Sequence, residues 1–481
     1  MASTRFSRAI TRAHPWRTRG ALRRVHREQS AQRATRRELI TLAAPIAAAM
    51  LGESMLGIVD TRLVGALGAE ALAGVGTASV LMYLAYALGL GLMRGVKVHT
   101  AYAIGEGRPQ DAPRYAQAGA LFGLGLGAVI FALTRDATRV FLWLGVSPAV
   151  ARSAAEFTHA RAFGAPAMLL VSAMVQSRQA QGDSRSAMIA GLATNVVNAT
   201  LAYALIHGAL GAPALGVSGA GYATAIAEWI EALGLLAYVA RCAGQQARTT
   251  APSALSLREA VARVWRLGAP TGAHFFAENL AFTVFTLLLG AMGAAELAAH
   301  QLALSAVRVS FLPGFAVAEA ASVLVGRSLG RGQLSEADRV ARAALRIALG
   351  FMGGCSLVFV LWSKPIARFF TQDSRVVPLA AQLLLIAAIF QVFDGANMVL
   401  RGLLRGAKDV RFVAIAGTTI AWICIPGLTY VLGRRLHWGA TGGWWGFVAE
   451  TVIATIVLGA RWIHGPFRRA HIVGTQTRAK L

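Results

Sequence analysis

The sequence predicts an all-α, polytopic membrane protein with twelve transmembrane helices arranged as two parallel six-helix repeats around a central cleft. Of its 481 residues, 56% are hydrophobic and only 14% are charged, whereas about a quarter of the residues in a soluble domain are charged. Its apolar stretches reach the roughly 20 residues that a helix needs to cross a bilayer. Lipid forces backbone groups to pair within each segment, which favours helices. The short alternating strands of an outer-membrane barrel are not seen.

The twelve expected spans follow one another with short loops between them. They cover about 39–63, 72–98, 115–135, 154–176, 186–208, 217–240, 262–290, 297–325, 340–362, 377–400, 412–433 and 440–463.

Basic residues are expected to gather in alternate loops. In the first repeat these groups are Arg94, Lys97, Arg108 and Arg114, followed by Arg178 and Arg185. A third group, around the linker, is Arg241, Arg248, Arg258, Arg263 and Arg266. In the second repeat they are Arg327, Arg331, Arg339 and Arg342, followed by Arg401, Arg405, Lys408 and Arg411. The intervening loops carry fewer bases. This positive-inside pattern predicts a multi-pass protein of the cell membrane (the inner or plasma membrane) with both termini in the cytoplasm.

The chain contains two copies of one six-span unit. The stretch "LAAPIAAAMLGESMLGIVDTRLVGALGAEALA" aligns without a gap with "LGAPTGAHFFAENLAFTVFTLLLGAMGAAELA", 225 residues later. Pro45 then matches Pro270, and Glu53 matches Glu278. Because six is even, both copies enter the membrane in the same direction, and an axis along the membrane normal relates them. A transported substrate is expected at the midplane between such halves.

This pattern divides the chain into five segments: a basic cytoplasmic arm (1–37), a first bundle (38–240), a cytoplasmic linker (241–261), a second bundle (262–463) and a cytoplasmic tail (464–481). The arm holds eleven arginines and one acid. It suits either a segment held near anionic lipid headgroups or an organellar presequence. The net charge of +25 raises the question of nucleic acid. Apart from Phe6 and Trp16 the arm lacks aromatic residues for base stacking, so no nucleic-acid partner is expected.

Carboxylates within the spans are the candidate functional groups, above all Asp60, Glu278 and Asp394. A charged acid facing lipid costs several kcal/mol, so each must face a polar cavity, pair with a base or stay protonated. We expect these three to couple transport to protons or cations. Glu53 lies two turns before Asp60 on the same face and is a weaker candidate for the cleft.

Polar neighbours extend these faces. Gln391 and Asn397 flank Asp394 at helical spacing, and Asn195 with Asn198 forms a comparable patch in the fifth span. The roles of Glu228, Glu231 and Glu450 stay open between the headgroup region and the cleft. Glu319 is the repeat image of Arg94, and the two could bridge the halves.

No signature of an enzyme is found. Cys242, Cys355 and Cys424 are scattered without metal or redox spacing, and no nucleophile with a base is evident. We therefore expect no catalytic residues, no organic cofactor and no protein-bound metal other than a coupling Na⁺.

Several short stretches together resemble the multidrug and toxic compound extrusion (MATE) family, nearer its NorM-like branch. They are "VDT", "LGAEALA", "AEN", "AAHQ", "QVFDG" and "LRGAKDVR", in that order and at matching spacing, and the resemblance covers about residues 38–463. It implies a secondary antiporter that exports organic, often cationic, compounds against an inward flow of protons or sodium ions. It also implies a monomer that alternates between inward-facing and outward-facing forms.

The resemblance assigns roles by position. Asp60 corresponds to the acid implicated in first-half coupling, and Glu278 with Asp394 to the acids of a second-half cation site that could hold Na⁺. Thr224 matches a polar residue associated with the first-half site. Ala202 stands where some relatives have a second acid, and Phe390 where an aromatic hydroxyl is frequent. Both departures remove sodium ligands and favour protons as the coupling ion, although the choice between H⁺ and Na⁺ stays open.

Two other functions remain as alternatives. A lipid-linked saccharide flippase of the wider superfamily would line its cleft with bases for a pyrophosphate, whereas acids predominate within the expected spans. A membrane enzyme acting on lipid would need a reactive constellation that is not found. The substrate is therefore expected to be a small organic cation, with membrane lipid as the surrounding partner.

Overall fold

The structure, a computed structural model, describes residues 15–248 and 251–468, except for the side chains of residues 15–27. Within these ranges the chain is helical and has no strand. The first half contains α1 (Pro15–Gly65), α2 (Ala69–Gly105), η1 (Pro109–Asp111), α3 (Ala112–Leu133), η2 (Thr134–Asp136), α4 (Ala137–Trp143), α5 (Pro148–Ala162), α6 (Ala165–Ala180), α7 (Ser184–His207) and α8 (Gly216–Ala247).

The second half contains α9 (Leu257–Gly290), α10 (Ala294–Gly330), α11 (Leu334–Phe370), α12 (Val376–Gly406), α13 (Val410–Trp422), η3 (Ile423–Gly427), η4 (Thr429–Arg435) and α14 (Gly439–His464). The last two η segments are π-helical, and Pro426 within them lacks the N–H that an α-helical register requires there. The all-helical fold class is thus confirmed.

The internal repeat is present in three dimensions with its expected register. α2 and α10 begin and end 225 residues apart, as Ala69–Gly105 and Ala294–Gly330. The residues before them, Gly68 and Gly293, have φ of 110° and 148°, a backbone region that residues with a Cβ rarely adopt. The two halves therefore share local geometry as well as sequence.

Eleven helices among the described residues are long and apolar enough to cross a membrane. The expected fourth span, 154–176, is divided between α5 and α6. Pro166, in the first turn of α6, has no N–H for the α5 carbonyls and would clash with a continuous helix. Gly164 also lets the Arg161 and Glu228 side chains approach the break, because a Cβ there would lie 2.5 Å from Glu228 Oε2.

Helix α1 links the two bundles. It starts at Pro15, so the expected arm (1–37) is helical from that residue onward, and residues 1–14 lie outside the described residues. Its Leu39 and Leu42 pack in a core shared with α10, α11 and α12, whereas Val64 packs with α2, α5 and α7. The helix changes bundle around Pro45, whose missing N–H favours a bend.

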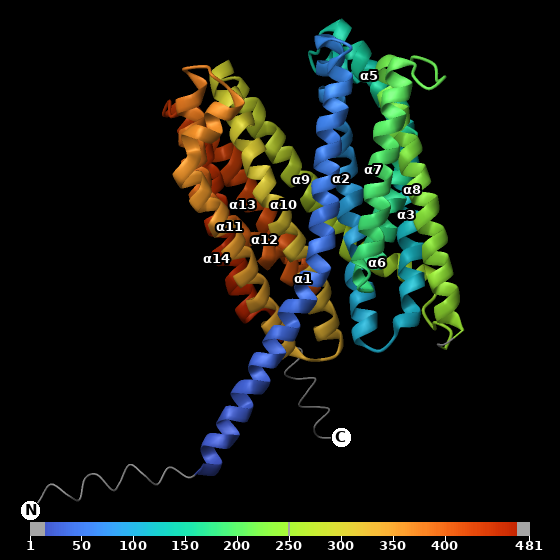
Figure 1. The fold of residues 1–481 in the computed structure, drawn as a ribbon, viewed down its shortest axis with the longest axis vertical. Helices are drawn as coiled ribbons and strands as arrows, with labels where there is room; N and C mark the ends of the chain where they lie inside the picture. Colours follow the sequence, from blue (N-terminus) through green and yellow to red (C-terminus); the bar gives the residue numbers. More distant parts are fainter. Residues whose placement is uncertain (1–14, 249–250, 469–481) are drawn as a thin grey trace, which may run out of the picture.

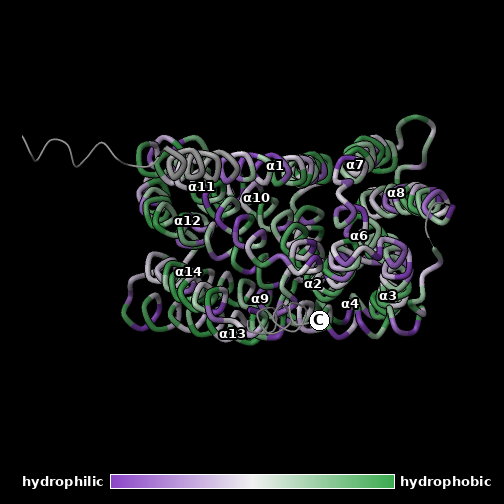
Figure 2. The backbone as a smooth tube through the Cα atoms, turned by 90° about the horizontal axis from the view of Figure 1, so that it is seen from below, coloured by the Kyte–Doolittle hydropathy of each residue, from purple (hydrophilic) through white to green (hydrophobic). Residues whose placement is uncertain are grey.

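Figure 1 shows α2–α8 as one bundle and α9–α14 as a second, which diverge away from the end where α1 begins and α14 ends. Viewed along the helices in Figure 2, α2 and α10 lie near the centre, with α1 and α9 on opposite sides of them. The remaining helices surround this centre. α8 extends to Ala247, into the expected linker (241–261), and α9 begins at Leu257.

Glycines bring the two bundles together at one end of the molecule. A Cβ on Gly91 would collide with the backbone of Gly272 in α9, and one on Gly268 would collide with the backbone of Leu92. Such close packing of helix backbones requires small residues. These contacts place the C-terminal half of α2 directly against α9, which positions the charged residues described next.

Candidate functional site

A cluster of charges lies within the second bundle, where Arg401 of α12 holds two acids. Its guanidinium forms ion pairs with Glu278 of α9 and with Glu450 of α14, the latter at 2.7 Å. Nε of Arg401 also donates to Asn397 at 3.0 Å. His274 lies one turn before Glu278, with Nε2 3.7 Å from the carboxylate. The planar guanidinium suits this multiple pairing better than an ammonium would.

Asp394 borders this cluster without a base of its own. It is 7% exposed, and its Oδ2 is buried with no hydrogen-bond partner among the described residues. The charges acting on it are those of Glu450, Arg401 and Glu278, and none of the described bases lies within ion-pair distance of it. A buried carboxylate in this setting is well placed to take up a proton or a cation.

The first bundle holds a corresponding group around Asp60. Its carboxylate interacts with the side chain of Asn198 in α7, while its Oδ1 is buried without a partner among the described residues. Thr224 of α8 donates to Asn198 Oδ1 at 3.5 Å. Three helices thus bring the predicted residues Asp60, Asn198 and Thr224 together.

Two more acids line the same bundle near α1. Glu53 is exposed, and Asn195 lies against the preceding Gly52, where a Cβ would be 3.1 Å from its Nδ2. Glu231 of α8 interacts with Thr194 of α7. Neither acid forms an ion pair with a described base. This part of the first bundle therefore holds carboxylates that no described base pairs with.

The sequence left Glu228 open between the headgroup region and the interior of the protein. In the structure it lies within the bundle. Arg161 of α5 binds it with two hydrogen bonds of 2.7 and 2.6 Å. Glu450 is likewise buried and paired, at 5% exposure. Glu228 and Glu450 occupy equivalent places in the stretches "AIAE" and "FVAE", so each half holds one acid of this kind with an arginine.

The third cluster lies where the bundles meet. Glu319 of α10 pairs with Lys97 of α2 at 2.6 Å, with Arg405 of α12 at 2.9 Å and with Arg94 of α2 at 3.7 Å. Glu319 is 4% exposed and Lys97 2%. The expected bridge between Arg94 and Glu319 is confirmed, and it forms part of a larger network.

The assignment of several bases to loops was wrong. Arg94, Lys97, Arg178, Arg401 and Arg405 lie within helices and are buried or half-buried. Each is paired with an acid, which offsets the cost of moving its charge away from water. The helices extend further than the apolar stretches indicate.

Arg161, Arg401 and His274 were not predicted from the sequence as members of these clusters. The equivalence of Glu228 and Glu450 was the available signal, because two buried acids at matching positions each require a base. Gln391, in contrast, is fully buried and donates to Ser310 of α10. The structure thus does not bring Gln391 to the Asp394 carboxylate.

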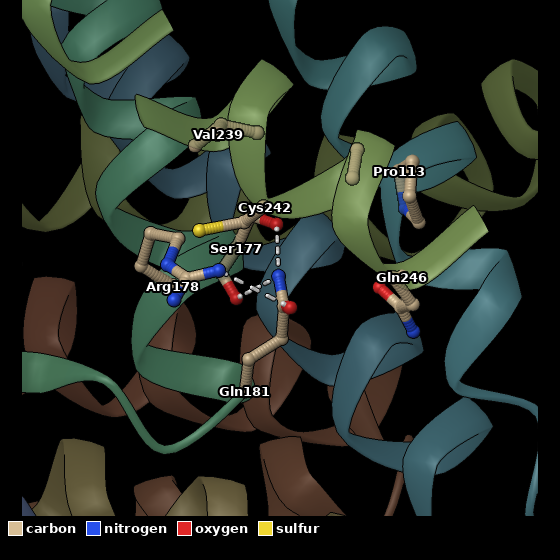
Figure 3. Close-up of a pocket in the computed structure, with 8 residues that line it drawn as sticks. Pro113, Ser177, Arg178, Gln181, Val239, Cys242 and Gln246 are labelled. Atoms are coloured by element: carbon tan, nitrogen blue, oxygen red, sulfur yellow. Dashed lines mark hydrogen bonds between the residues drawn. The ribbon is translucent and has the colours of Figure 1, made fainter. Parts of the chain in front are cut away.

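A small pocket opens in the first bundle between α6 and α8 (Figure 3). Arg178 and Cys242 line it, and Gln181 donates to Ser177 across its floor at 3.2 Å. Arg178 is already held by Asp183 at 2.7 Å. The described part of the chain contains no group of three or more His, Cys, Asp or Glu residues that could hold a metal ion.

Two parallel bundles related by an internal repeat, with buried acids between their helices, are typical of membrane transporters. Residues 45–204 and 270–431 match the sequence profile of the MatE family, one match in each repeat. The chain belongs to this family, whose members are transporters and not enzymes.

Individual relatives agree with this assignment. The chain is 30% identical to the probable multidrug resistance protein NorM of Pseudomonas syringae pv. tomato, over 87% of this chain and 93% of that one. It is 31% identical to the multidrug resistance protein NorM of Vibrio vulnificus, over 89% and 95%. The crystal structure of the eukaryotic MATE transporter AtDTX14 has the same fold, with a TM-score of 0.83 at 17% identity, over 93% of this chain and 99% of that chain.

Proposed function

We propose that this transporter is an antiporter of the cell membrane that exports small organic cations in exchange for protons, by alternating access. One observation carries the proposal. Asp60 and Asp394, one in each bundle, both have a buried carboxylate oxygen without a hydrogen-bond partner among the described residues. Neither has a described base within ion-pair distance. A cation or a proton supplies what both lack.

The carboxylates exchange one positive charge for another. An organic cation binds while Asp60 and Asp394 are ionised, and protonation from outside removes the charge that holds it. A protonated acid is far less costly to bury than its anion, so the neutral cleft can close and reopen inward. Substrate and proton shift the conformational equilibrium only through their different affinities for the two states.

Relatives named for multidrug resistance support an organic cargo. Protons are favoured over Na⁺ because two positions near the acids lack oxygen ligands. Ala202 is a buried methyl group, and Phe390 packs its ring against Phe447 at 5.8 Å. Na⁺ held at Glu278 and Asp394 is the alternative. The positive-inside pattern supports cytoplasmic termini, and the presence of both halves in one chain supports a monomer.

A lipid-linked saccharide flippase is the second candidate, because three bases share one acid where the bundles meet. Arg94, Lys97 and Arg405 all contact Glu319. Their excess positive charge could attract a pyrophosphate. Arg94 is next to Gly95, however, where a Cβ would lie 2.7 Å from the Val264 carbonyl oxygen of α9. This close contact between the bundles favours a structural role for the bases.

The test is transport by purified protein in proteoliposomes. Efflux of a fluorescent organic cation is followed under an imposed pH gradient and then under a sodium gradient. The variants are Asp60→Asn, Asp394→Asn and Glu278→Gln. Asp136→Asn is the matched control, because this acid is exposed and outside the three clusters.

Proton-driven efflux that is lost in Asp60→Asn or Asp394→Asn and kept in Asp136→Asn supports the proposal. Sodium-driven efflux retains the antiporter and replaces the coupling ion. Full activity in all site variants contradicts the role of these carboxylates. If no organic cation moves under either gradient, the flippase becomes the leading candidate.

A further inference from the structure

A second hollow, of about 490 Å³ including the space open to solvent, lies at the C-terminal end of α2. Both halves of the protein contribute to it. From the first half come His99, Tyr102, Ala103, Glu106, Arg108 and Tyr115, and from the second come Arg263 of α9 and Lys408 of the α12–α13 turn. The hollow is separate from the clusters of buried acids.

Most charges around this hollow already have partners. Glu106 and Asp111 are both bound by Arg108, the second at 2.7 Å. Arg263 donates to the Tyr115 hydroxyl at 3.1 Å and forms an ion pair with Glu259. The carboxylate of Glu106 is therefore neutralised where it borders the hollow.

Lys408 is the exception. Its Nζ lies 3.6 Å from the centre of the Tyr102 ring, and none of the described acids lies within ion-pair distance of it. The ring attracts the ammonium but accepts none of its hydrogen bonds in the ordinary way. Three N–H donors thus remain available to an anion at the mouth of the hollow.

The backbone conformation at Lys408 is unfavourable for a residue with a side chain, which indicates that the lysine side chain serves a function. Lys408 has φ of 62°, in the left-handed region that costs a residue with a Cβ about 1 kcal/mol or more. It ends a helix with the next N–H bonded to the carbonyl five residues back, Asp409 to Leu404. The same bond occurs at five turns in which glycine occupies the left-handed position: Gly107, Gly145, Gly182, Gly208 and Gly332.

The surroundings of the hollow fit the headgroup level of a membrane. Alongside the Tyr115–Arg263 contact, α3 and α9 also meet through Phe122 and Trp265, whose rings stack at 5.8 Å. Trp265 is 54% exposed. Exposed tryptophan next to basic residues is typical of the interface between lipid and water. Anionic headgroups attract such bases.

We propose that this hollow binds the phosphate group of an anionic ligand, with Lys408 as its principal contact and Arg263 as a second. An anionic lipid headgroup and a soluble phosphate compound share this chemistry. The position at the membrane interface favours the lipid. A bound phosphate would contact residues of both halves and hold their cytoplasmic ends together.

The test measures lipid binding to the purified full-length protein in detergent by native mass spectrometry. Phosphatidylglycerol is titrated, with zwitterionic phosphatidylcholine as the comparison lipid. Lys408→Asn removes the charge with a residue that tolerates positive φ. Lys408→Arg keeps the charge. Arg331→Gln is the matched control, since Arg331 is an exposed base on the same side of the protein, paired with Glu336 and outside the hollow.

We expect Lys408→Asn to weaken phosphatidylglycerol binding roughly fivefold, as one basic residue near anionic headgroups contributes about 1 kcal/mol. Lys408→Arg and Arg331→Gln should bind like wild type. Displacement of the lipid by inorganic phosphate supports the site and assigns it to a soluble ligand, and no displacement assigns it to lipid. Unchanged binding in Lys408→Asn, or an equal loss in Arg331→Gln, overturns the proposal.

Discussion

Arg94 and Glu319 occupy the same position in the two repeats, 225 residues apart, and form a salt bridge with each other at 3.7 Å. Two repeat images can touch only close to the axis that relates the halves. Gly105 and Gly330 are another such pair, and each packs against backbone of the other helix. The axis therefore passes between α2 and α10, and the network around Glu319 fastens the bundles along it.

Removal of the Glu319 charge should destabilise the closed junction. In Glu319→Gln, Lys97, Arg94 and Arg405 lose their shared acid while they remain buried. Breaking a buried pair in this way costs about 3–5 kcal/mol. Thermal unfolding in detergent measures the loss. Glu336→Gln is the control, because its pair with Arg331 is more exposed and should contribute about 0–1 kcal/mol. Equal effects of the two variants would show that the Glu319 network adds nothing.

A methyl group at Gly330 should separate α2 from α10. A Cβ there would lie 2.6 Å from the Tyr102 carbonyl oxygen and 3.1 Å from the Cα of Gly105. Overpacking of this kind typically costs 1–3 kcal/mol, about the same as we expect for Gly330→Ala. Gly350→Ala is the matched control, since open space surrounds that position in α11. It should be neutral or stabilising, by about 0.5–1 kcal/mol. A Gly330→Ala protein as stable as wild type would contradict the tight contact.

Replacement of Arg401 by lysine should impair transport although the charge is kept. Arg401 contacts Glu278, Glu450 and Asn397 at once, and a lysine ammonium cannot reproduce this planar arrangement. We expect a loss of roughly tenfold or more in transport rate, equivalent to about 1.4 kcal/mol. Proteoliposome efflux measures it. Arg411→Lys, at an exposed position on α13, should retain the wild-type rate. Near-normal efflux by Arg401→Lys would show that one charge suffices.

Much of the fold follows from patterns that the sequence displays directly. Apolar length predicts the helices, and the repeat predicts that both halves share one register, as the matching bounds of α2 and α10 confirm. The break between α5 and α6 was missed because apolar residues continue across it. Gly164 and Pro166 mark it, but both residues also occur within intact membrane helices.

The site was predictable where its residues share a helix or a repeat position. Asp60, Glu278 and Asp394 are found inside apolar stretches, and burial of a charge is itself a signal. The partner of each acid was not predictable in this way. Arg161 and Glu228 are 67 residues apart, and Arg401 lies 123 residues from Glu278. Tertiary packing alone brings such pairs together, so bases near the helix ends resembled loop charges.

Phosphate binding at Lys408 should weaken as the pH rises through about 8. Desolvation of its ammonium lowers the pKa of Lys408 to about 8; Glu106 opposes this shift, while Arg263 and Arg108 add to it. The protonated form attracts the phosphate, so binding is strongest below pH 8 and weaker above it, whereas an ordinary lysine stays charged to about pH 10. His99, Tyr102 and Tyr115 also border the hollow.

The same lipid titration at pH 7 and pH 9 measures the change in affinity. Lys408→Arg separates the titration of Lys408 from that of the other groups around the hollow, since arginine stays charged throughout. We expect wild-type affinity to fall several-fold between the two pH values while the arginine variant changes little. A parallel fall in both proteins would assign the titration to another residue.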